Sequence, residues 1–315
     1  MAVNWSKVAI VTGADAGYGR LLEGLLRSLR VAERSLGASL RIHVLDFGLD
    51  AAAEAAAAEH AEIVRLDPPL PMPGGPERRA FFLSRMAKAF LPDLVPGFSA
   101  YVWLDADVWV QLPRALESVV LPLGRREFAA VPELDRAYRS LFDLTLRQHG
   151  VRARRIVRSF GRAAASQLLR LPDVNSGVVA ARAGAAMWSA WQARLAQVFA
   201  IDDDPHFISD QAALNAAIFL DRVPFYPLPS TLNWCVGGTL PRIDRSGMLV
   251  TPLPPHQTIG LCHLTGIGIS KPVPVQRTTG QRNDMLLDYL SVQAWRAENP
   301  PRRGAASQAA GHTRS

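Results

Sequence analysis

The chain has 315 residues, 49% of them apolar and 20% charged, which suits one large α/β domain or two modest ones and excludes a wholly disordered chain. No apolar stretch approaches the roughly 20 residues that cross a bilayer, and residues 1–7 lack the apolar core of a signal peptide, so we expect a soluble, cytoplasmic protein. The formal net charge of +7 indicates affinity for anions such as nucleotides, phosphates or anionic lipids.

Apolar runs alternate with helix-like segments along the chain, which is the pattern of an α/β protein. The runs predict strands at 8–11, 40–45, 62–65, 101–104, 128–131 and 178–181. Helices are expected at 19–36, where leucines form one stripe, and at 51–60, 77–91, 184–199 and 209–220. Residues 300–315 are polar and of low complexity, so we expect a disordered tail.

Residues 136–170 form an arginine-rich segment in which Asp143 is the only acid. A solvated helical face is the first interpretation of such a charge run. A docking surface is the alternative, which would contact an anionic acceptor or the inner face of the membrane as a peripheral site. We treat the segment as an insertion or an acceptor-side element, and we expect no nucleic-acid partner.

A glycine-rich turn follows the first predicted strand, in the stretch VAIVTGADAGYGR at residues 8–20. It resembles the phosphate loop of a short-chain dehydrogenase, and Asp46 after the second strand suits a ribose hydroxyl. Such an enzyme also needs a Tyr-x-x-x-Lys pair, and none of the five tyrosines has a lysine four residues later. The chain therefore lacks the catalytic residue pair that a short-chain dehydrogenase requires.

Two carboxylates flank a small residue in AYVWLDADVWV, residues 100–110. Asp105 and Asp107 follow an apolar strand and precede a second apolar run, so burying them without a cation would be costly. Both can reach one divalent ion that bridges the phosphates of a nucleotide diphosphate. Cys235 and Cys262 form no CxxC pair, which argues against a cysteine-based zinc site.

This motif resembles the metal motif of the glycosyltransferase family 8 enzymes, which have a GT-A fold and use nucleotide-sugar donors. The resemblance implies an α/β architecture with a Rossmann-like mixed central sheet flanked by helices. CHLTGIGISKP, residues 262–272, is similar to the family segment that supplies the third metal ligand, here His263. With Asp105 and Asp107, the implied donor set suits Mn²⁺ or Mg²⁺.

Further segments in the same order resemble the family's donor-binding motifs. ADAGY (14–18) implies that Asp15 binds the base and Tyr18 stacks on it, and LSRMAKAFLPDL (83–94) brings Arg85 toward the donor. In DVNSGVVA (173–180), Asn175 and Ser176 would line the sugar pocket.

SDQAALN (209–215) resembles the segment beside the anomeric carbon, which makes Asp210 and Gln211 the implied catalytic residues. Gly266 and Lys271 are implied to hold the pyrophosphate, with Asp105 also facing the donor. Four residues separate Gly266 from Lys271 where the family usually has two, so the phosphate contacts are a point of departure.

The resemblance implies one GT-A glycosyltransferase domain over residues 1–299. The expected activity is retaining, metal-assisted transfer of a hexose, with UDP-glucose or UDP-galactose as donor. The acceptor is open and includes saccharides and lipid-linked sugars. A nucleotide-sugar-binding protein with impaired catalysis is the alternative, and a short-chain NAD(P) dehydrogenase is the third hypothesis.

Overall fold

A computed structural model describes residues 2–66, 82–138, 146–201 and 209–300. Its strands are β1 (Val8–Ala14), β2 (Arg41–Asp46), β3 (Glu62–Arg65), β4 (Ala100–Leu104), β5 (Val108–Val110), β6 (Phe128–Pro132), β7 (Val174–Arg182), β8 (Tyr226–Pro227), β9 (Trp234–Cys235), β10 (Arg242–Ile243), β11 (Leu249–Val250), β12 (Leu261–His263), β13 (Val273–Arg277) and β14 (Arg282–Met285). The α-helices are α1 (Gly19–Leu36), α2 (Ala51–Ala58), α4 (Leu91–Leu94), α5 (Arg114–Val120), α6 (Leu146–Leu168), α7 (Ala186–Ile201), α8 (Asp210–Phe219) and α9 (Tyr289–Glu298).

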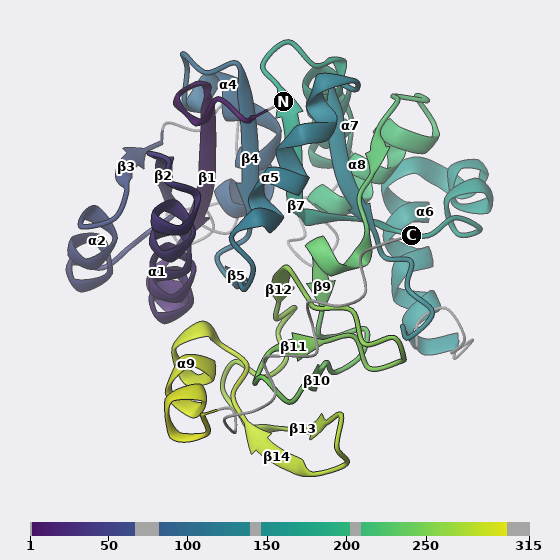
Figure 1. Ribbon diagram of the computed structural model, residues 1–315. Helices are drawn as coiled ribbons and strands as arrows, with labels where there is room; N and C mark the ends of the chain where they lie inside the picture. The colour runs from purple at the N-terminus through teal and green to yellow at the C-terminus, as the bar shows by residue number, and fades with distance from the viewer. Residues whose placement is uncertain (1, 67–81, 139–145, 202–208, 301–315) are drawn as a thin grey trace.

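The centre of the molecule is a seven-stranded sheet in the order β3-β2-β1-β4-β7-β6-β8 (Figure 1). β1 pairs in parallel with both β2 and β4, whereas β7 is antiparallel to β4 and to β6. The sheet is therefore mixed and mostly parallel. The chain leaves β1 toward β2 on one side and returns to its other side as β4, which creates a topological switch point between β1 and β4.

Both faces of this sheet are buried, as the fully buried strand β4 shows. Side chains alternate along a strand, so Val102 and Leu104 pack into the core beneath α1 and α5, while Tyr101 and Trp103 pack into the core beneath α7 and α8. Helices cover the two faces, giving three layers (Figure 1). The expected fold class, a mixed α/β sheet flanked by helices, is confirmed.

Local sequence explains how the helices begin and end. α1 buries its leucine stripe and ends at Gly37, whose left-handed φ of 60° favours glycine. Asp50 caps α2 by accepting a hydrogen bond from the Ala53 amide. Ser209 caps α8 in the same way through the Ala212 amide, which fixes the start of the helix that carries Asp210.

The C-terminal part of the chain adds two small sheets below the central one (Figure 1). One has the order β5-β12-β9 and the other the order β11-β10-β13-β14. A separate hydrophobic cluster, which includes Trp109, Trp234 and Ile243, fills the space between them and α9. The sequence did not predict these sheets, because several of their strands have only two residues and show no periodicity.

The expected strands and helices recur with small shifts of their ends. β7 begins four residues before the expected position, so Asn175 and Ser176 lie within the strand. The expected helix at 77–91 lies outside the described residues up to position 81; residues 82–86 are helical, and Ala87–Phe90 form a 3-10 turn before α4. The expected disordered tail also lies outside the described residues, apart from Pro300.

The arginine-rich segment is largely the helix α6, interrupted where Gly161 adopts a φ of 84°. Arg154, Arg158 and Arg162 are exposed on it. A solvated or docking face remains a prediction. Among the described residues, no helix combines the length and apolarity needed to cross a bilayer.

Candidate active site

The strands at the switch point deliver acidic residues to one edge of the central sheet. Asp15 directly follows β1, and Asp105 directly follows β4, the parallel neighbour of β1. Because the carboxyl ends of parallel strands meet at the same edge, this is where α/β sheets bind ligands. The position agrees with a nucleotide site at this edge.

Asp105, Asp107 and His263 converge into one cluster, each offering a ligand atom within 4.8 Å of the others. The Nε2 atom of His263 lies 3.3 Å from Oδ1 of Asp107 and 3.8 Å from Oδ2 of Asp105. The structure thus brings together the three residues expected to bind metal, although His263 is more than 150 residues away in sequence.

Backbone pairing holds the three side chains in place. The Asp105 amide donates to the Gly177 carbonyl on β7 at 2.8 Å, and the Leu264 amide donates to the Asp107 carbonyl at 3.1 Å. His263 also faces Gly177 closely: a Cβ at that glycine would lie 2.4 Å from the imidazole Cε1. Position 177 therefore has to be glycine for the ring to keep this place.

A chain of amide hydrogen bonds fixes the tautomer of His263. Nδ1 of His263 lies 2.9 Å from Oδ1 of Asn233, whose Nδ2 donates to Oδ1 of Asn175 at 2.8 Å. Nδ2 of Asn175 in turn donates to Glu133 at 2.7 Å. With this amide orientation the Asn233 oxygen accepts from Nδ1–H, so in the neutral ring Nε2 carries the lone pair and faces Asp105 and Asp107.

This donor set fits a divalent cation. Two carboxylates and an imidazole lone pair suit Mn²⁺ or Mg²⁺, and an outer partner on the second ring nitrogen is the usual arrangement for a metal-binding histidine. Burial opposes ionisation of Asp107, but the His263 ring lowers the pKa of that carboxyl. Burial also disfavours the charged ring of His263, but Asp107 outweighs it and raises the pKa of His263 well above its usual value, so a bound cation would replace the proton on Nε2.

Lys88 is a functional candidate that the sequence analysis did not assign. Its Nζ lies 2.8 Å from Oδ1 of Asp105 and 3.0 Å from Oδ2 of Asp210, and its side chain is only 8% exposed. Burial favours the neutral amine, but the two carboxylates raise the pKa of Lys88, so the ammonium stays charged. The available signal was its rarity, since the chain has only three lysines.

The residues expected around the sugar form one hydrogen-bonded group. Ser176 donates its hydroxyl to Asp210 at 2.7 Å, and the Gln211 side chain lies 3.5 Å from the Ser176 amide and 3.4 Å from Glu133. Burial opposes ionisation of Asp210, yet Lys88 and Arg85 lower its pKa. Burial raises the pKa of Glu133, a carboxyl that the sequence analysis missed.

The expected base-binding residues lie at the same edge. Asp15 accepts a hydrogen bond from the Gly17 amide at 2.9 Å, so it also shapes the turn. Tyr18 is 45% exposed, and burial, together with Asp107, Asp15 and Asp105, raises its pKa. The positive charge of Arg85 lowers the pKa of Asp210 and opposes the rise in the pKa of Tyr18.

Gly266 and Lys271, the pair expected to bind the pyrophosphate, are not joined to the other candidate residues in this way. Gly266 has a φ of 80°, and a Cβ there would meet no atom within 4 Å. Lys271 is exposed in the loop between β12 and β13. Within the described part of the chain, no hydrogen bond or ion pair joins Lys271 to the aspartates or to His263.

The fold of this chain is similar to the folds of solved glycosyltransferase structures. The chain has a GT-A glycosyltransferase fold. It is similar to the galactosyltransferase LgtC, crystallised with donor and acceptor sugar analogs, with 18% identity, 82% of this chain and 87% of that chain covered, and a TM-score of 0.50. It is also similar to the bifunctional glycosyltransferase WbbM, with 14% identity, coverage of 84% and 47%, and a TM-score of 0.52.

Sequence comparison gives no such likeness. No model of a known protein family matches the chain, and no curated protein sequence matches it. The fold therefore rests on the structural similarity, and membership of glycosyltransferase family 8 remains a prediction.

Proposed function

We propose that this chain is a metal-assisted, retaining glycosyltransferase that moves a hexose from a nucleotide sugar, with UDP-glucose or UDP-galactose as donor. The observation that carries the proposal is the cluster of Asp105, Asp107 and His263 at the switch point of a GT-A fold. The charge that develops on the leaving diphosphate has to be offset, and this cluster offers ligands for a cation at the edge where the nucleotide would lie.

Asp105, Asp107 and His263 would hold Mn²⁺ or Mg²⁺. When bound, the ion acts as a Lewis acid that offsets the charge developing on the leaving phosphate oxygen. Asn233 orients the imidazole for this task through its contact with Nδ1. Asp15 and Tyr18 would read and stack on the base, with Arg85 beside them.

Asp210 and Gln211 would lie beside the transferred hexose, together with Asn175 and Ser176. The Asp210 carboxylate, held ionised by Lys88, would orient sugar hydroxyls and stabilise an oxocarbenium-like transition state. The carboxamide of Gln211 is a poor nucleophile. We therefore infer front-face attack, in which the acceptor oxygen bonds to the anomeric carbon as the bond to the phosphate breaks and that phosphate takes the acceptor's proton.

A second candidate is a nucleotide-sugar-binding protein that has lost turnover. The exposed Lys271, which makes no ion pair with Asp105 or Asp107 among the described residues, favours it, because the leaving diphosphate would lack one expected cation. The acceptor, the cytoplasmic location and a peripheral membrane contact through residues 136–170 stay predictions under either candidate.

A donor screen by thermal shift tests the proposal. UDP, GDP and ADP, then UDP-glucose and UDP-galactose, are added with and without Mn²⁺. We expect UDP ligands to raise the Tm only with Mn²⁺, because the cation would join the diphosphate to the aspartates. A ligand at about 100 times its Kd adds about 2.7 kcal/mol of stability, which the thermal shift detects. Slow donor hydrolysis by the same samples supports an active transferase. Binding without any hydrolysis supports the impaired binder, and no Mn²⁺-dependent shift with any nucleotide contradicts both.

A further inference from the structure

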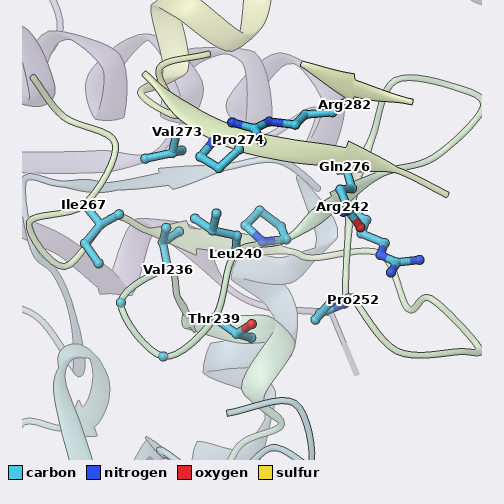
Figure 2. A pocket seen from close by; sticks show the side chains of 13 residues that line it. Val236, Thr239, Leu240, Arg242, Pro252, Ile267, Val273, Pro274, Gln276 and Arg282 are labelled. Atoms are coloured by element: carbon cyan, nitrogen blue, oxygen red, sulfur yellow. The ribbon is translucent and has the colours of Figure 1, made fainter. Parts of the chain in front are cut away.

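A groove of about 510 Å³ lies between the C-terminal four-stranded sheet and the loop that follows β9 (Figure 2). Its walls are mostly apolar and include Val236, Leu240, Ile267 and Pro274. Arg242 and Gln276 lie toward the opposite end from Ile267 and Val236 in Figure 2. None of the described residues that line the groove is acidic.

The apolar end of the groove adjoins the candidate metal cluster. The Val236 amide donates to the carbonyl of His263 at 2.9 Å. The Ile267 amide donates to the carbonyl of Leu264 at 2.9 Å, and the Leu264 amide donates to the carbonyl of Asp107. Val236 is thus one backbone hydrogen bond from His263, and Ile267 is two from Asp107. A molecule bound in the groove would therefore have one end near the candidate metal cluster and would extend from there toward Arg242.

Two glycines hold the groove's loop wall in place. A Cβ at Gly238 would lie 2.8 Å from the Tyr138 ring, and one at Gly237 would lie 2.7 Å from the Thr265 hydroxyl. The Gly237 amide also donates to that hydroxyl at 2.7 Å. This close packing against fixed neighbours preforms the groove, as is common for small-molecule sites.

The far end carries a row of cationic and amide side chains across three strands. Arg242 on β10 is the register partner of Gln276 on β13, which is the partner of Arg282 on β14. Directly paired residues point to the same face of a sheet, so all three side chains line the groove; in Figure 2 Arg282 extends toward Pro274, and Arg242 extends to the other side. Arg282 also pairs with Asp284 at 3.2 Å, but both side chains are 62% exposed, where such pairs are weak.

We propose that this groove binds the acceptor through an apolar body that ends in an anionic oxygen group, a carboxylate or a phosphate. The inference rests on the proposed transferase function, since it makes the groove the acceptor's subsite. The aliphatic and proline walls favour burial of an apolar body. The planar guanidinium of Arg242 suits bidentate binding of the terminal oxygens.

Direct binding tests this without a known acceptor. Octanoate and octyl phosphate are titrated into the protein by calorimetry, with octan-1-ol as the probe that lacks the anion. We expect both anions to bind, and the tighter one to identify the group. Arg242→Gln should weaken them about tenfold, because a charge-assisted hydrogen bond contributes about that factor. Arg245→Gln, an exposed arginine in the next turn and outside the groove lining, should bind like wild type.

The titration is repeated with UDP and Mn²⁺ present, since a transferase holds donor and acceptor together. Retained octanoate or octyl phosphate affinity is the expected result. The proposal is overturned if neither anion binds, if octan-1-ol binds equally well, if Arg242→Gln changes nothing, or if UDP with Mn²⁺ expels the anion. Such results alongside Mn²⁺-dependent UDP binding leave the proposed function standing, whereas anion binding without any nucleotide binding counts against that function instead.

Discussion

The Nδ1 atom of His263 lies 2.9 Å from the Oδ1 atom of Asn233, a residue 30 positions away that contacts neither aspartate of the cluster through any described hydrogen bond. This contact selects the ring tautomer that presents Nε2 to Asp105 and Asp107. The candidate metal site therefore depends on an amide that is not itself a candidate ligand.

Asn233→Ala tests that dependence. Loss of the acceptor for Nδ1–H frees the ring and its tautomer, and we expect Mn²⁺ affinity to fall by about 10–100-fold, the usual effect of losing an outer partner. Calorimetric titration of Mn²⁺ gives the affinity, and circular dichroism checks the fold. Asn4→Ala, an exposed asparagine near the N-terminus, is the matched control. An unchanged Mn²⁺ affinity in Asn233→Ala contradicts the assigned role.

Gly177→Ala should displace the imidazole of His263. The new methyl group would lie 2.4 Å from the Cε1 atom, a distance that forces the ring to move. We expect the Mn²⁺ affinity to fall by at least about tenfold, which is the lower end of the usual effect of losing an outer contact. Gly184→Ala, just past the end of the same strand, meets no atom within 4 Å and should behave like wild type. Equal Mn²⁺ affinities in the two variants would show that ring placement does not limit binding.

Lys88→Met removes the cation between Asp105 and Asp210. Breaking a buried ion pair leaves uncompensated charge, so we expect the free energy of unfolding to fall by about 3–5 kcal/mol. Urea denaturation measures the change, and Lys271→Met, at an exposed lysine, should have little effect. A loss in Lys88→Met no larger than that of the control argues against a buried, charged Lys88.

His43 predicts an acid-sensitive contribution to stability. It lies buried on β2, neither ring nitrogen has a hydrogen-bond partner among the described residues, and burial lowers its pKa despite Glu62 at 3.5 Å. Its folded-state pKa is below the unfolded value of about 6.5, so the unfolded chain binds more protons and stability falls as the pH drops below that value.

His43→Phe should remove this dependence, and Phe98, already in edge contact with the ring, can pack against the new side chain. Urea denaturation between pH 5 and pH 7 compares the two proteins. The free energy of unfolding should fall more steeply toward pH 5 in the wild type than in His43→Phe. Parallel pH profiles would mean that His43 does not titrate as described.

The sequence predicted six of the seven strands of the central sheet, because each is a run of four or more residues between turn or helix signals; β8, with two residues, is too short to show a pattern. It also identified Asp105 and Asp107 by their position between two apolar runs. His263 followed only from resemblance, because in isolation a histidine between Cys262 and Leu264 is typical of a buried core residue.

The sequence assigned no role to Lys88, Asn233 or Glu133, for a common physical reason. Each of these residues has its role through contacts with other segments of the chain, and no local sequence pattern predicts those contacts. The C-terminal sheets were missed because strands such as Arg242–Ile243 are too short to show a period, and their pairing is set by the tertiary fold.

The most direct test of the metal-centred site is UDP binding by Asp107→Asn, measured by calorimetry with and without Mn²⁺. Asn keeps the size of the side chain but removes the charge that faces His263. We predict that the wild type binds UDP tightly only with Mn²⁺. In Asp107→Asn the UDP affinity measured with Mn²⁺ should fall by more than the ~10–100-fold that loss of an outer partner causes. Asp93→Asn, at an exposed aspartate of α4, should keep it. Equal Mn²⁺-dependent UDP affinity in wild type and Asp107→Asn would contradict the assignment of the metal site.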